Sequence, residues 1–147
     1  MFAELAERLL NEVGEALPAD VLAGLARVVG PAAGPAWDCP MLYVALASAT
    51  RQMDSKGCVT HTDLEWRVGI VREVCVVDDR GVPPTAREVT GDGLAILDDA
   101  GAIVRALEDL TPADYGARVF DVGTWTPLGP DGGMGGGEWM LRVRVVE

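Results

Sequence analysis

The side chains of this sequence that could carry out chemistry are few and lie far apart. Thiol and imidazole groups come from Cys39, Cys58, Cys75 and a single histidine, His61. Cys58 and His61 are spaced to act as two zinc ligands or as a thiolate–imidazole pair. A tetrahedral zinc site usually uses two such pairs, and here one is present. We therefore expect no metal, cofactor or catalytic site, and Cys39 and Cys75 as small buried residues on strands.

Residues 127–137 form a second candidate site, rich in glycine and proline. A phosphate-binding loop needs Gly-x-x-x-x-Gly-Lys-Ser/Thr between a strand and a helix. This run has neither the lysine nor the hydroxyl, and it leads into a segment with strand periodicity. We interpret it as a flexible hairpin loop that becomes ordered against a neighbouring protein.

Adjacent acids, at Asp78 and Asp79 and again at Asp98 and Asp99, are a third candidate. Neighbouring side chains diverge on a helix or a strand, so they are poor partners in general acid–base catalysis. A calcium loop needs alternating acids, which this sequence lacks. These residues therefore indicate turns or a solvated surface.

Composition excludes several classes of function. The 147 residues carry 12 basic and 23 acidic side chains, for a formal charge of −11. This excess of acid opposes non-specific nucleic-acid binding and docking on an anionic membrane. The first residues carry acids where a signal peptide carries bases, and the apolar stretches are too short to span a bilayer. We expect a protein made and assembled in the cytoplasm, without a membrane partner.

Hydrophobic periodicity predicts the elements of the first half. Apolar residues spaced three and four apart indicate a helix over residues 2–17. Charge-free residues 39–50 predict a strand covered on both faces, with a helix over 41–49 as the alternative that Pro40 and the β-branched flanks disfavour. Alternation over 64–77 predicts another strand. A turn over residues 54–57 joins them into an antiparallel hairpin, long enough to project beyond a small core.

The second half predicts a further helix and hairpin. Thr85 and Glu88 have capping-box spacing and begin a helix, bent or divided at a glycine, that ends before Thr111. Alternating residues 119–126 and 138–146 predict the two last strands. The expected fold is a single α+β domain over 1–147, in the order α-β-β-α-β-β, with helices packed on an antiparallel or mixed sheet.

Tryptophans and alanines suggest where partners bind. Trp66 and Trp139 fall on predicted core faces, whereas Trp37 and Trp125 border loops, where tryptophan often serves as an interface anchor. A row of small residues, Ala45, Ala47 and Ala49, would allow close approach of another layer or subunit.

Two stretches resemble a known family. They are Ala36-Trp37-Asp38-Cys39 before a strand, and residues 125–139 from one tryptophan through the glycine run to the next. With the acidic N-terminal helix, the element order and the length, the chain resembles the small neck proteins of long-tailed phages of actinobacteria. Within that group it most resembles the tail terminator. Met134 stands where the family pattern would have a cysteine, so the resemblance implies no role for a thiol in this loop.

The resemblance implies a structural protein of the virion neck, without enzymatic activity. Copies would form a ring, typically a hexamer, that caps the major tail tube protein and joins the tail to the head connector, while genomic DNA passes through the lumen without specific binding. Alternatives are the stopper or adaptor of the same neck, and a small enzyme or metal-binding protein that uses Cys58 and His61. The candidate lumen acids are Asp78, Asp79, Asp98 and Asp99. The candidate interface residues are Trp37, Ala45, Ala47, Ala49, Trp125, Gly132, Gly133, Met134, Gly135, Gly136 and Gly137.

Overall fold

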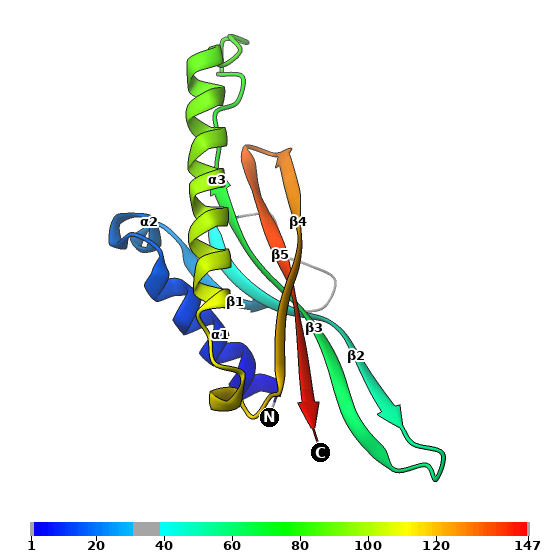
Figure 1. The fold of residues 1–147 in the computed structure, drawn as a ribbon. Helices are drawn as coiled ribbons and strands as arrows, with labels where there is room; N and C mark the ends of the chain where they lie inside the picture. The colour runs from blue at the N-terminus through cyan, green and yellow to red at the C-terminus, as the bar shows by residue number, and fades with distance from the viewer. Residues whose placement is uncertain (1, 31–38, 147) are drawn as a thin grey trace.

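The described residues form a five-stranded sheet with helices on one face (Figure 1). These residues, 2–30 and 39–146, come from a computed structural model of the chain. The elements in chain order are α1 (Phe2–Ala16), α2 (Ala19–Ala23), β1 (Ala26–Gly30), β2 (Met41–Met53), β3 (Val59–Glu73), α3 (Ala86–Glu108), the 3-10 helix η1 (Pro112–Tyr115), β4 (Val119–Asp131) and β5 (Met134–Val146).

The sheet is mixed, and the prediction of an α+β fold is confirmed. Its strand order is β1-β2-β3-β5-β4, with β1 parallel to β2 and every other neighbouring pair antiparallel. The predicted element order lacked β1, because residues 26–30, Ala-Arg-Val-Val-Gly, show no alternation of polar and apolar side chains. β1 is held by its backbone pairing with β2, which local sequence patterns do not reveal.

β3 is the central strand, and its two faces meet different surroundings. Leu64, Trp66, Val68 and Ile70 lie on the helix side, where they join the main core with α1, α3 and β5. That core includes fully buried Leu9 of α1 and Ile103 of α3. The prediction that β2 is covered on both faces holds for its first five residues, which are all buried.

α3 is one continuous helix, without the break that its glycines predicted (Figure 1). The predicted capping box is present: Glu88 N donates to Thr85 Oγ1 at 3.2 Å, and Thr85 N donates to Glu88 Oε1 at 3.1 Å. The C-terminal half of α3 packs in the core through Ile103 and Leu107. The N-terminal half extends beyond the sheet (Figure 1).

The glycine-rich run is part of the sheet, so the prediction of a flexible loop over 127–137 is wrong. β4 continues to Asp131 and β5 begins at Met134, which leaves Gly132 and Gly133 as the turn, with φ of +56° and +79°. Residues 134–137 are buried between β3 and β4. A Cβ at Gly136 would overlap the carbonyl oxygen of Ile70, and one at Gly137 would overlap the indole of Trp125. These glycines are therefore needed for close packing.

We predict that Gly136→Ala destabilises the fold by about 3 kcal/mol or more, because its methyl group meets backbone that cannot move aside. Urea unfolding followed by circular dichroism measures the change. The matched control is Gly91→Ala in α3, where a Cβ meets nothing within 4 Å. It should raise stability by up to about 1 kcal/mol. Equal, small effects of the two substitutions would show that the run is a loop after all.

Candidate assembly surfaces

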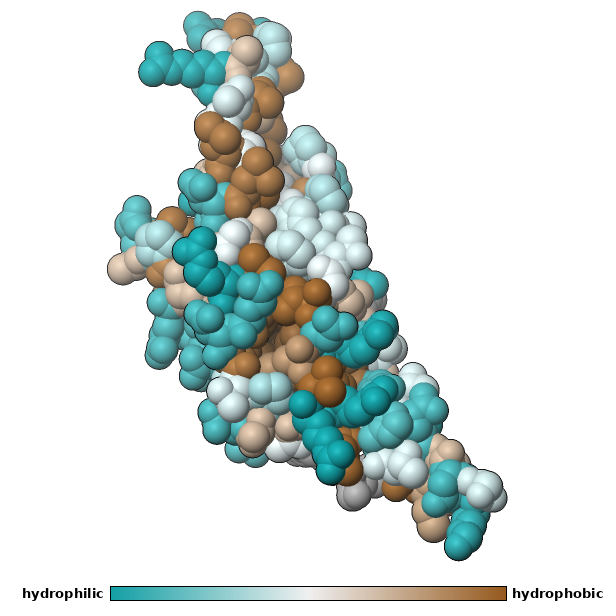
Figure 2. Space-filling model, in the orientation of Figure 1, coloured by the Kyte–Doolittle hydropathy of each residue, from teal (hydrophilic) through white to brown (hydrophobic). Residues whose placement is uncertain are grey.

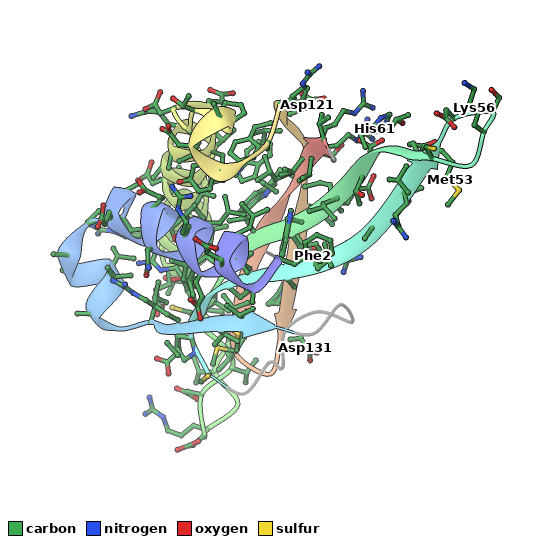
Figure 3. All side chains as sticks on the ribbon, turned by 90° about the horizontal axis from the view of Figure 1, so that it is seen from below. Phe2, Met53, Lys56, His61, Asp121 and Asp131 are labelled. Carbon is green, nitrogen blue, oxygen red and sulfur yellow. The ribbon has the colours of Figure 1, made fainter. Side chains whose placement is uncertain are left out.

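The β2–β3 hairpin projects from the body of the molecule, as its length predicted (Figure 1). All six residues from Ser48 to Met53 are exposed, although the two strands remain paired to Met53 and Val59. Figure 3 shows Met53 and Lys56 at the far end of this extension. Met53 is 61% exposed. The hairpin therefore holds one large apolar side chain, that of Met53, in solvent at the end of an ordered strand pair.

Hydrogen bonds fix the turn at the tip of this hairpin. Asp54 accepts from the backbone N–H groups of Lys56 at 2.8 Å and Cys58 at 3.0 Å. The Asp54 N–H donates to the Cys58 carbonyl at 2.9 Å, and Gly57 has φ of +81°. The predicted turn over 54–57 is confirmed, and its shape is set by the chain itself.

The predicted alanine row does not lie on one face. A bulge between Leu46 and Ser48 shifts the register, so that Ala45 pairs with Arg67 and Ala49 pairs with Leu64, on the opposite face. Ala45 is fully buried and packs with Met41 and Tyr43. Ala47 is half-buried, and Ala49 is exposed. A bulge turns later residues to the other face, so the row cannot act as a single contact surface.

An apolar groove lies between the N-terminal half of α3 and the glycine-rich ends of β4 and β5. Its volume is about 510 Å³, and its lining includes Ile96 and Leu97 of α3, Trp125 of β4, and Gly135 and Gly136 of β5. The glycines carry no side chains to fill the space. Figure 2 shows apolar side chains along α3 beside the pale surface of these strand ends. Two of its lining residues on α3, Val89 and Leu97, are exposed, and Leu94 is exposed on the same half of the helix.

Among the predicted interface residues, four of the glycines lie in the turn or the groove, and the fifth, Gly137, is buried beside the indole of Trp125. Gly132 is exposed and Gly133 half-buried, and Gly135 and Gly136 line the groove. Met134 is buried with Met41, Tyr43 and Val71 on the other face of the sheet, so its prediction as an interface residue is wrong.

Of the tryptophans, Trp125 lines the groove and Trp139 packs against Trp125. The rings of Trp125 and Trp139 lie 5.4 Å apart at 56°, and Trp139 Nε1 donates to the Ala100 carbonyl at 2.9 Å. Trp66 is in the core as predicted, and Trp139 is partly buried against it. Trp125 borders the groove, where a partner could contact it. Trp37 lies outside the described residues.

Three of the four candidate lumen acids are on the surface. Asp79 and Asp98 are exposed, and Asp78 accepts from the backbone N–H groups of Arg80 and Val82, both at 2.9 Å. These backbone hydrogen bonds, led by that from Val82, lower the pKa of Asp78.

Asp99 contradicts its prediction as a lumen acid, because it is 4% exposed. Its Oδ2 lies 3.2 Å from Arg72 Nη1 of β3, and this contact lacks hydrogen-bond geometry. Burial raises the pKa of Asp99, and the guanidinium of Arg72 offsets part of that rise. Asp99 therefore joins α3 to the sheet and cannot face a lumen.

A polar cluster lies on the face of the sheet opposite the helices. The Tyr43 hydroxyl donates to Glu138 Oε2 at 2.5 Å, and Arg67 Nε lies 3.8 Å from Glu138 Oε1. Burial and then the Glu138 hydrogen bond raise the pKa of Tyr43. The Tyr43 hydroxyl occupies the space beside Gly69, where a Cβ would lie 2.6 Å from it. The cluster links β2, β3 and β5, which stabilises the sheet at its centre.

The cysteines and the histidine do not form the predicted alternative site. Cys58 is in the exposed hairpin turn, and His61 contacts Thr60 through Nδ1 at 3.2 Å and Asp63 through Nε2 at 3.7 Å. Cys75 is exposed and follows β3, and Cys39 is half-buried before β2, so neither is buried on a strand as expected. Among residues 2–30 and 39–146, no group of three or more His, Cys, Asp or Glu side chains could hold a metal ion.

Searches against protein-family models and curated protein sequences gave no match. In the part of the chain that the structure describes, no helix has both the length and the apolar character needed to cross a bilayer.

The structure identifies surface residues that the sequence predictions missed. Met53, Leu94 and Leu97 are among its most exposed large apolar side chains. Leu94 and Leu97 are three residues apart and lie off the core face that includes Ile103 and Leu107. This second apolar stripe on the helix could have predicted the exposed apolar surface of α3 from the sequence.

We predict that Asp99→Asn makes the protein increasingly stable relative to the wild type as pH rises above about 4, the ordinary carboxyl value. Folding raises the pKa of Asp99, so the folded protein binds the carboxyl proton more tightly than the unfolded chain does. The wild-type protein therefore loses stability as pH rises and this proton dissociates. Urea unfolding over a pH series measures the difference.

The matched control for this substitution is Asp98→Asn, which removes an equal formal charge from the exposed neighbouring position. It should show no comparable trend with pH. If the two variants follow the same curve, the ionisation of Asp99 does not limit stability.

Proposed function

We propose that this chain is a structural virion protein of the neck of a long-tailed phage, and that it acts as the tail terminator. Copies of it form a ring, typically a hexamer, on the end of the tube of major tail protein. The ring joins the tail to the head connector, and genomic DNA passes through its lumen. The resemblance of residues 36–39 and 125–139 to this family motivates the proposal.

The observation that carries the proposal is the extended hairpin. A monomer gains no core from the last residues of β2, which are exposed although they are ordered and paired. The N-terminal half of α3 likewise exposes Val89, Leu94 and Leu97 beside an apolar groove. A neighbouring subunit that covered Met53 and these apolar residues of α3 would remove their surface from water, which is favourable.

The charge of the chain also supports a role in which DNA slides past. A formal charge of −11 opposes tight binding of the chain to the phosphates of the DNA backbone. Asp78, Asp79 and Asp98 are the exposed acids that remain candidates for the lumen lining. An acidic lining would repel the DNA backbone and prevent it from adhering.

The stopper or the head–tail adaptor of the same neck is the alternative within this proposal. The stopper and the adaptor would also assemble as rings, so the shape of one subunit supports these two functions and the terminator function equally. Binding to tail tubes distinguishes the terminator, because it is the component that contacts the tube directly.

We predict that the purified protein binds the ends of tubes assembled from the major tail protein of the same genome. Negative-stain images should show ring-shaped caps at tube ends, and sedimentation should recover the protein with the tubes. Tubes incubated with an unrelated acidic protein of similar size are the control. A protein that stays monomeric at high concentration and does not bind tubes would contradict the proposal.

A further inference from the structure

The two ends of the molecule have complementary shapes. Figure 1 shows the β2–β3 hairpin at one end of the molecule, and the N-terminal half of α3 with the β4–β5 turn at the other. The groove is lined by residues of this second end. β3 lies between them and has 15 residues. An extended strand of that length spans about 50 Å at about 3.3 Å per residue. The tip therefore cannot reach the groove of its own chain, but it can reach the groove of a neighbour.

The groove offers an apolar cavity with an acidic margin. Val89, Ile96, Leu97 and Trp125 supply apolar surface, and Asp92 supplies a carboxylate. Leu97 is 62% exposed. Residues 78–92, which include the margin of the groove, contain four acids against two arginines. Such a groove favours an apolar side chain that is accompanied by a basic one.

The hairpin tip carries this combination of side chains. Met53 is exposed at the end of β2, and methionine adapts readily to irregular apolar cavities. Residues 51–58 contain two basic residues, Arg51 and Lys56, against one acid, Asp54. The tip is thus net basic in a chain whose total charge is −11. Its charge is opposite to that around the groove.

We infer that the hairpin tip of one copy docks in the α3 groove of the next copy, with Met53 against the apolar wall and Lys56 near the acidic margin. This inference rests on the proposed function and names the contact that builds the ring. A tip and a groove on opposite ends make a head-to-tail contact, which closes into a ring when the rotation between copies permits.

The free edge of β4 is a poor alternative contact between copies. Pro127 and Pro130 have no N–H to donate, and the register of β4 shifts between Val122 and Trp125. Prolines and bulges on an edge strand oppose the addition of another strand. Assembly through the tip and the groove avoids this edge.

Two native cysteines allow a direct test with a short bismaleimide. Cys58 is in the tip, and Cys75 lines the groove. They flank β3, so a crosslink between them must join two copies. A neighbouring carboxylate, that of Asp92, raises the pKa of the Cys75 thiol, so the reaction is best run at mildly alkaline pH. Mass spectrometry should find linked peptides containing Cys58 and Cys75 in the crosslinked oligomers. Cys58→Ser and Cys75→Ser should each abolish this link, and Cys39→Ser should retain it.

Two further variants test the contact without crosslinking. Met53→Asp disables the tip and Leu97→Asp disables the groove, and both positions are exposed, so the fold should tolerate the changes. Each variant alone should fail to form rings, whereas a mixture of the two should form dimers through the one intact tip and groove. Val119→Asp makes the same apolar-to-acid change at an exposed position on the β4 edge and should assemble normally.

The outcomes separate this inference from the proposed function. The docking inference would be wrong if rings form without the Cys58–Cys75 link and also form in both Met53→Asp and Leu97→Asp. The proposed neck function would be unaffected by that result. Loss of rings in Val119→Asp alone would assign the contact to the β4 edge, and it would also overturn the inference. A wild-type protein that forms no oligomer, with or without tail tubes, would contradict both.

Discussion

The pairing of β3 with β2 and β5 along nearly its whole length is the constraint on which the rest of the structure depends. A strand of 15 residues is longer than the core beneath it, so the pairing carries one end out as a hairpin. At the other end, β5 can approach β3 and the Trp125 indole because Gly136 and Gly137 have no side chains. The same glycine-rich end of β5 forms one side of the groove beside α3, through Gly135 and Gly136.

The same constraint connects the fold to the proposed function. Head-to-tail assembly requires two different surfaces on each subunit. This subunit has a net basic hairpin tip that carries Met53, and an apolar groove with an acidic margin. Other contacts hold the interior together, such as the Tyr43–Glu138 hydrogen bond and the hydrogen bond from Trp139 Nε1 to the Ala100 carbonyl. Stability and assembly therefore depend on different residues, and substitutions can separate them.

Sequence patterns correctly predicted the features that are determined by residues close together in the chain. The periodicity of α1, the Thr85–Glu88 capping box, the hairpin turn at Asp54 and the covering of both faces of β2 follow from neighbouring residues. The features that the sequence patterns missed depend on contacts between residues far apart in the chain. β1 exists through its pairing with β2, and Asp99 is buried beside Arg72 from another element. The glycine run has the composition of a loop, but its packing against β3 makes it a strand. The exposed leucines of α3 were visible in the sequence as a second stripe, whereas the groove beside them required the fold.

A cryo-electron microscopy reconstruction of the assembled protein on its tail tube tests the central claim most directly. The account predicts that the Asp54–Cys58 turn of each subunit lies against Leu97 and the glycine-rich strand ends of the next subunit around the ring. A ring whose subunits meet through the edges of β1 and β4, with the hairpin tips in solvent and the grooves empty, would contradict it.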